Sequence, residues 1–218
     1  NSRILTLFRY WNLVEYFFPY KYMMDQKWDA TLTEMLPRFI NIASELDLHV
    51  AIKELVVKLD DTHATFGTNK LFERFGEKFI PAIIKIVEEK VVITSLHNDS
   101  LAKISDLRVN DIITKVEGKT IKQIINENQK YVEGSNQFAK FKNFYWAIFN
   151  GNTDTVEIEF VRDGKTAVKT IKRYLYQDLK IKFEEKEKFK LLENNTGYVD
   201  MGFIEIDDIP TMMNQFKD

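Results

Sequence analysis

Apolar residues in the first third of the chain recur at the spacing of amphipathic helices. The pattern predicts a first helix that ends before Pro19, a second over residues 28–44 and a third over residues 47–59. The first helix is expected to bury Leu5, Phe8, Leu13 and Phe17. Pro37 lies inside the second pattern, which predicts a kink or a break there, and Asp47 is the expected N-cap of the third helix.

The middle of the chain changes to the alternating apolar and polar pattern of β-strands. Five strands are expected, at residues 80–86, 91–96, 111–116, 156–162 and 166–174. A polar turn joins the first two, and Asp163 with Gly164 gives a strong two-residue hairpin signal between the last two. Helices are expected over residues 121–131 and 137–149. Short strands with two helices suit a small, partly open barrel.

The last region starts near Gln177 and combines strands with one helix. A charged strand pair is predicted around residues 184–188, and a further strand over residues 196–202. Residues 208–216 predict a capped helix with Pro210 in its first turn. A strand followed by a capped helix is the start of an α/β unit, which needs parallel strands as partners. We therefore expect the chain to be a fragment of a longer protein.

Composition narrows the class of protein. The chain has 218 residues, of which 44% are hydrophobic and 13% aromatic, so it can form a substantial core. The formal net charge is −2, so no basic excess suggests a nucleic-acid partner, and no apolar run approaches the ~18 residues of a membrane span. The absence of cysteine excludes disulfides and cysteine nucleophiles. We expect no cofactor and no metal, because His49 and His97 have no ligand-like spacing relative to His63.

Three motifs follow one another in an informative order. Residues 59–66, Leu-Asp-Asp-Thr-His-Ala-Thr-Phe, look like a short Asp-x-His-Ser/Thr signature. Residues 98–121 then contain Leu-Arg-Val-Asn-Asp and a Glu-Gly-Lys turn, and residues 196–202 contain Gly-Tyr-Val. This order resembles the tail-specific, or C-terminal-processing, serine peptidases. Residues 98–121 resemble part of the PDZ domain of that family. Asp106 and Asn110 stand there where the family usually has glycine, and Asn tolerates the left-handed conformation that glycine would supply.

The resemblance implies an α+β protein in three parts. These are a helical N-terminal bundle (residues 1–70), a PDZ-like small β-barrel with two helices that binds peptides (residues 76–175), and the first strand–helix unit of an incomplete α/β catalytic core (residues 177–218). It also implies a Ser nucleophile activated by a Lys base, both beyond residue 218, so this chain alone should be inactive. An extracytoplasmic location, periplasmic or in the cell envelope, is a further expectation from the family.

His63 is the candidate catalytic residue within the chain. In the related tricorn-type peptidases a histidine in a similar segment belongs to the catalytic group, whereas in the Ser–Lys branch the matching histidine is not the base. Asp60 and Asp61 could form a carboxylate–histidine pair with it, or simply a polar helix end. The alternative role is a structural histidine whose ring satisfies nearby backbone groups.

A PDZ domain binds an extended peptide as an added strand at a sheet edge and holds its terminal carboxylate on the amides of a preceding loop. Here that loop maps to residues 75–82, and the helix over residues 137–149 should form the opposite wall of the groove. Pro81 removes one amide, so carboxylate capture should be weak or should shift to a neighbouring residue. The expected peptide-binding residues are Gly76, Phe79, Ile80, Ala82, Phe141 and Tyr145.

The leading interpretation is the substrate-selecting N-terminal part of a Ser–Lys serine endopeptidase. Its PDZ domain would capture polypeptides by their exposed, apolar C-terminal tails. A non-catalytic scaffold protein that uses the same helical and PDZ-like parts is the main alternative. A carrier of lipids or retinoids is a third, since some proteins with a related core bind apolar ligands and residues 138–149 are rich in aromatic side chains.

Overall fold

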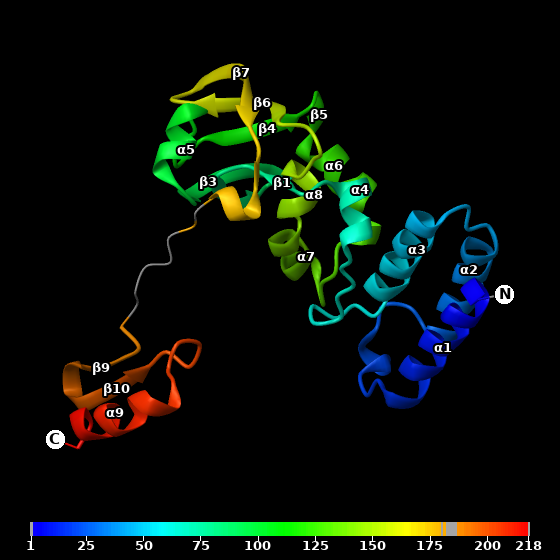
Figure 1. Ribbon diagram of the computed structural model, residues 1–218, viewed down its shortest axis with the longest axis horizontal. Coiled ribbons are helices and arrows are strands. Elements are labelled where there is room, and N and C mark those ends of the chain that lie inside the picture. Colours follow the sequence, from blue (N-terminus) through cyan, green and yellow to red (C-terminus); the bar gives the residue numbers. More distant parts are fainter. Residues whose placement is uncertain (1, 180, 182–186, 218) are drawn as a thin grey trace. The chain divides into compact units, whose positions relative to one another are not determined.

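The computed structural model describes residues 2–179, 181 and 187–217, which form two units (Figure 1). The larger unit holds the first of these ranges, and the smaller unit holds the rest. Helices and antiparallel sheets occur together, so the chain is an α+β protein, as the sequence predicts. The strand pair predicted around residues 184–188 falls mainly on residues 184–186, which lie outside the described residues. Among the described helices, none is both long and apolar enough to cross a membrane.

Three helices make the N-terminal part of the larger unit. They are α1 (Ser2–Phe17), α2 (Trp28–Ile40) and α3 (Glu45–Val57), and the short helix η1 (Lys21–Met23) follows α1. Leu7 and Val14 form the buried face of α1. The face predicted from the sequence is wrong, since its four residues are exposed: Leu5, Phe8, Leu13 and Phe17. The indole N–H groups of Trp11 and Trp28 each donate to the other residue's carbonyl oxygen, at 3.1 and 3.0 Å, and this exchange fixes the rotation of α1 against α2.

The ends of α2 and α3 differ from the predicted ends. α2 stops at Ile40 and runs without interruption through Pro37, which lies in its last turn. The N-cap of α3 is Ser44, whose hydroxyl accepts the amide of Asp47 at 3.1 Å. Asp47 in turn accepts the amide of Ala43 at 3.0 Å. The predicted cap at Asp47 is therefore wrong: Ser44 is the N-cap, and Asp47 lies in the first turn of α3, where its side chain accepts an amide from the residue before the cap.

The rest of the larger unit is built mainly on an antiparallel sheet with the strand order β2-β3-β4-β6-β7, and a second sheet pairs β1 (Lys78–Phe79) antiparallel with β8 (Tyr174–Leu175). The strands are β2 (Ala82–Val87), β3 (Lys90–Leu96), β4 (Ile112–Val116), β6 (Thr155–Arg162) and β7 (Lys165–Lys172), and β5 (Lys119–Thr120) pairs with β4. The α-helices of this part are α4 (Phe72–Phe75), α5 (Asp99–Ile104), α6 (Ile121–Asn128), α7 (Gln137–Asn143) and α8 (Tyr145–Phe149). The sheet is open, with β2 and β7 at its edges, and the described strands do not close it into a barrel.

Both predicted hairpins are confirmed. Glu88 and Glu89 join β2 to β3 with φ values of 48° and 58°, and Asp163 and Gly164 join β6 to β7 with φ values of 50° and 74°. Two consecutive left-handed residues make the turn that suits the twist of antiparallel strands. The two turns connect the outermost strand pairs of the sheet, β2 with β3 and β6 with β7.

Asp106 and Asn110 both adopt the left-handed backbone conformation that glycine favours. Asp106 has a φ of 45° and Asn110 a φ of 74°. Arg162 binds the segment that contains these two residues. Two of its nitrogens donate to Asp111 at 2.7 Å, and its third nitrogen donates to Asp106 at 2.7 Å. Lys169 also donates to Asp106 Oδ2 at 3.2 Å. Hydrogen bonds from Arg162 and then Lys169 hold the pKa of Asp106 far below its usual range.

The smaller unit contains a two-stranded sheet and one main helix. Its strands β9 (Phe189–Leu192) and β10 (Thr196–Val199) pair antiparallel, and α9 (Ile209–Gln215) follows them. Pro210 lies in the first turn of α9, as predicted, and the rings of Phe189 and Phe216 meet edge to face at 6.3 Å. The predicted strand exists but is shorter. Its observed partner is antiparallel, whereas the sequence led us to expect parallel partners.

Candidate functional site

The outer edge of β2 is the feature of the sheet most suited to binding an extended chain. β2 pairs with β3 along one side, and no described strand pairs with its other side. Ile84 and Ile86 are half-buried against the core, while Ile83 and Val87 alternate with them and are 43% and 52% exposed. An edge strand of this kind offers a row of backbone donors and acceptors to an incoming strand, with apolar side chains on both of its faces.

A wall of aromatic side chains flanks this edge. α7 lies beside β2, and α8 continues the same wall with Tyr145. Phe141 and Tyr145 are half-buried against the core of the sheet. The hydroxyl of Tyr145 donates to the carbonyl oxygen of Ile80 at 2.8 Å, and its ring stacks on Phe79 with centroids 6.4 Å apart. Burial raises the pKa of Tyr145 well above its usual value, so this donor stays protonated in the neutral range.

The structure separates the residues predicted to bind peptide into three groups. Ile80 and Ala82 are fully buried, so they belong to the core and present no side-chain surface to a ligand. Gly76 is also buried and has a φ of 86°; a Cβ there would lie 2.2 Å from the Cα of Gly151. The half-buried aromatic residues are those that a peptide can reach: Phe79, Phe141 and Tyr145.

His63 lies on the loop that follows α3. Its side chain is 96% exposed, and its Nδ1 lies 3.3 Å from Asp61 Oδ1, which also accepts the backbone amide of His63 at 2.9 Å. The ring has no backbone partner among the described residues, although the structural alternative requires one. The Asp61 carboxylate therefore orients an imidazole ring that is open to solvent.

The loop of His63 is tied to the sheet part of the unit. Thr62 Oγ1 donates to Ser135 Oγ at 3.2 Å and accepts the amide of Ser135 at 3.1 Å. His63 and Ser135 both line a cavity of about 340 Å³, together with Phe18 and Tyr20. None of the described serine hydroxyls hydrogen-bonds a lysine or histidine side chain, so the described residues show no serine paired with a base.

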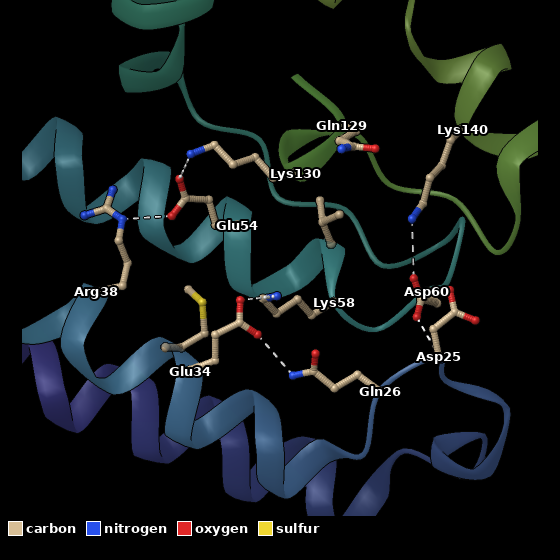
Figure 2. Close-up of a pocket in the computed structure, with 12 residues that line it drawn as sticks. Asp25, Gln26, Glu34, Arg38, Glu54, Lys58, Asp60, Gln129, Lys130 and Lys140 are labelled. Carbon is tan, nitrogen blue, oxygen red and sulfur yellow. Dashed lines mark hydrogen bonds and ion pairs between the residues drawn. The ribbon is translucent and has the colours of Figure 1, made fainter. Parts of the chain in front are cut away.

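A larger cavity of about 510 Å³ lies between the helices and the sheet part, and Figure 2 shows how its charges are paired. Glu54 of α3 binds Arg38 at 2.8 Å and Lys130 at 3.2 Å. Lys140 binds Asp60 at 3.4 Å, and Lys58 binds Glu34 at 2.8 Å. Each basic side chain in this cavity already has an acidic partner, so the cavity has no spare positive charge for an anion. Two of its pairs, Glu54 with Lys130 and Asp60 with Lys140, connect the helices to the sheet part of the unit.

Sequence reasoning missed one group of residues next to the predicted loop. Lys53 on α3 is 7% exposed and forms an ion pair with Glu133 at 3.2 Å. Its Nζ also lies 5.2 Å from the centre of the Trp146 ring. The sequence did contain a signal, because Lys53 stands in a run of α3 whose other members are almost all buried. A buried lysine needs a partner, and the partner here is 80 positions away in the chain.

Metal chemistry has no support in the part of the chain that the structure covers. No group of three or more His, Asp or Glu side chains among those residues could hold a metal ion.

Comparison with known proteins gives a limited result. No family model and no curated protein matches the chain. Among solved structures it is similar to a photosystem II D1 C-terminal processing protease, with a TM-score of 0.36 and 16% identity, over 87% of this chain and 46% of that one. It is also similar to an HtrA-type protease with a decapeptide, with a TM-score of 0.29 and 11% identity, over 53% of this chain and 33% of that one. Both neighbours are named as proteases, and this chain spans less than half the length of either.

Proposed function

We propose that the chain is the substrate-selecting N-terminal part of a serine endopeptidase of the Ser–Lys type. In this proposal it captures the C-terminal tails of polypeptides at the outer edge of β2. The observation that carries the proposal is the open, apolar edge of β2 with the aromatic wall of α7 and α8 beside it. The order of sequence motifs supplies the link to the peptidase class.

Capture at this edge follows from backbone chemistry. A peptide that pairs antiparallel with β2 gains main-chain hydrogen bonds, each contributing about 1 kcal/mol. Alternate side chains of the peptide then face the half-buried Ile84, Ile86 and Phe141, while the others lie over the exposed Ile83 and Val87. Both sets of contacts are apolar, so the edge favours tails rich in apolar residues.

The chemical step belongs to a part of the protein beyond the described residues. The proposal assigns the Ser nucleophile and the Lys base to a catalytic core that begins with residues 177–218, after a helical domain (residues 1–70) and a PDZ-like domain (residues 76–175). His63, exposed and oriented by Asp61, is then a candidate to meet that core. An extracytoplasmic location is part of the same proposal, from the family resemblance.

The test uses the intact chain and a fluorescently labelled peptide with an apolar tail. The matched control is the same peptide with N-methyl groups on alternate backbone amides, which removes donors without changing the side chains. Two methylated peptides are needed, one for each set of alternate amides. N-methylation of the amides that face β2 should weaken binding about fivefold for each lost hydrogen bond, and N-methylation of the amides that face away should have little effect. Equal affinity for all three peptides would exclude strand addition at the edge of β2.

A non-catalytic scaffold is the second candidate, because the described serine hydroxyls lack a lysine or histidine partner. The two functions predict the same peptide binding and differ only in hydrolysis. Reading the coding sequence past residue 218 separates them. A serine after a core strand with a lysine in the same domain supports the peptidase, and the absence of such a pair supports the scaffold.

A further inference from the structure

An apolar cavity of about 550 Å³ opens beside the loop that precedes β2. Five aromatic side chains line it: Phe66, Phe72, Phe75, Phe79 and Trp146. Phe75 and Trp146 meet edge to face with their centroids 4.9 Å apart. Gly76 also lines the cavity, so two residues predicted to bind the end of a peptide, Gly76 and Phe79, are part of its wall. The volume is within the usual range for a small-ligand site.

The wall of this cavity contains a buried ammonium group with unused capacity. Lys53 Nζ donates to Glu133 Oε2 at 3.2 Å and to the carbonyl oxygen of Phe66 at 3.4 Å. An ammonium group has three N–H donors, and the described residues provide partners for two of them. The remaining donor suits a negatively charged oxygen, for which a charge-assisted hydrogen bond is strong.

A second polar group in the wall has no partner. Asn150 lines the cavity, and its Oδ1 is buried without a hydrogen bond from any described residue. A buried acceptor that lacks a donor is unfavourable, and a ligand N–H would satisfy it. Lys53 and Asn150 thus offer a donor for a carboxylate and an acceptor for an amide, the two polar groups at the end of every peptide.

The loop itself has little capacity to hold a carboxylate. The amide of Gly76 donates to the carbonyl oxygen of Phe72 at 2.8 Å, and the amide of Lys78 donates to Gly151 at 3.2 Å. Pro81 has no amide hydrogen. These three positions of the loop therefore offer no free amide to a terminal carboxylate, and Lys53 is a side-chain donor in the adjoining cavity.

We propose, on the basis of the proposed function, that this cavity receives the last residue of the captured tail. Its α-carboxylate binds Lys53, and its backbone N–H donates to Asn150 Oδ1. Its side chain packs among the aromatic rings, so the favoured substrates end in a bulky apolar residue with a free carboxylate. The side chain of a terminal Asp or Glu would bring a further negative charge, in addition to the α-carboxylate, close to Glu133. We therefore expect such tails to be rejected.

The test measures binding of labelled peptides ending in Phe to the intact chain by fluorescence anisotropy. One peptide has a free α-carboxylate, and the other has a C-terminal amide. We expect the amide to bind about tenfold more weakly to the unaltered chain, and Lys53→Gln to weaken the acid to the level of the amide. The affinity of the amide should be the same for both proteins. Lys58→Gln at the C-cap of the same helix, which breaks the pair with Glu34, is the matched control and should change neither affinity.

Each outcome decides the proposal. Equal affinity of the acid and the amide for the unaltered chain overturns it, while capture at β2 remains. If no peptide binds the unaltered chain, the proposed function fails as well. Should Lys53→Gln not fold, Phe72→Ala replaces it, since Phe72 is 42% exposed; this variant should reduce the preference for a terminal Phe over a terminal Ala. Decanoate that binds one-to-one as tightly as the peptide and displaces it would overturn the proposal in favour of a carrier of apolar acids.

Discussion

The two edges of the sheet differ in the side chains that they present. β7 contains Lys165, Lys169 and Lys172, and Lys169 is fixed by a bond of 2.6 Å to the carbonyl oxygen of Asp106. β2 contains the single Lys85 among isoleucine and valine residues. Lysines on an edge strand oppose pairing with another chain. One edge of the same sheet is therefore protected and the other is open, which is the pattern expected where only one edge has a partner to bind.

Under the proposed function, the difference also separates stability from recognition. On the β7 side, Arg162 of β6 and Lys169 of β7 bind the carboxylates of Asp106 and Asp111, in the segment before β4. On the β2 side, the half-buried isoleucines and aromatic rings have apolar surface in reach of solvent. Damage to the first side should lower the free energy of unfolding, and damage to the second should lower the affinity for peptide.

The largest expected effect is on the β7 side, from Asp111→Ala. Asp111 is 1% exposed and binds two nitrogens of Arg162, so its removal leaves a guanidinium group without its main partner. We expect the free energy of unfolding in urea to fall by about 3–5 kcal/mol. Glu159→Ala, which removes the more exposed pair with Lys115 and a hydrogen bond from Thr114, should destabilise the fold much less than Asp111→Ala. Where Asp111→Ala is still folded its peptide affinity should be unchanged, and a loss of binding would contradict the separation of the two sides.

The next effect compares a glycine before β2 with a glycine before β7. Gly76 and Gly164 have φ values of 86° and 74°, but only at Gly76 would a Cβ collide with backbone atoms, those of Gly151. We expect Gly76→Ala to cost about 2–4 kcal/mol, from left-handed strain and overlap together, and Gly164→Ala about 1 kcal/mol from strain alone. Thermal denaturation of both variants gives the comparison. Equal costs would mean that the close approach of Gly76 to Gly151 is not tight in solution.

Local signals made most of the fold predictable. The Asp163 and Gly164 turn and the capped helix at Pro210 depend on a few adjacent residues, and both are confirmed. The buried face of α1 was not predictable in this way, because apolar residues lie on more than one of its faces. The exchange of indole hydrogen bonds between Trp11 and Trp28 selects the face, and those residues are 17 positions apart.

The candidate site was predictable only in outline. The alternating pattern and the turns placed β2 near the loop of Gly76, but they gave no measure of burial, so Ile80 and Ala82 were grouped with the reachable aromatic residues. The pairing of Lys53 with Glu133 joins segments 80 positions apart. A pattern along the chain cannot report such a contact, which forms only when α3 packs on the sheet part.

A smaller effect should follow from making β2 resemble β7. Ile86→Lys places a charge where a bound peptide would meet apolar surface, and we expect peptide affinity to fall about tenfold or more. The matched change on the other edge is Val168→Lys, at a residue that is 57% exposed, and it should leave the affinity unchanged. Circular dichroism checks that both variants fold. Similar losses for the two variants would show that the edges do not differ in function.

The smallest effect concerns pH at the beginning of β2. The amide of His97 donates to the carbonyl oxygen of Pro81 at 3.1 Å, so this histidine holds the entry to β2. Its Nδ1 is buried without a partner among the described residues, and burial lowers the pKa of His97 below 6.5. The unfolded state therefore binds more protons near that pH, and stability should be lost as the pH falls through about 6.5.

Hydrogen exchange, corrected for intrinsic rates, should show less protection around Ile83 at about pH 5.5 than at about pH 7.5, and no such change around Val168. His97→Gln should remove the difference, and equal loosening at both edges would show that the pH response does not arise at His97.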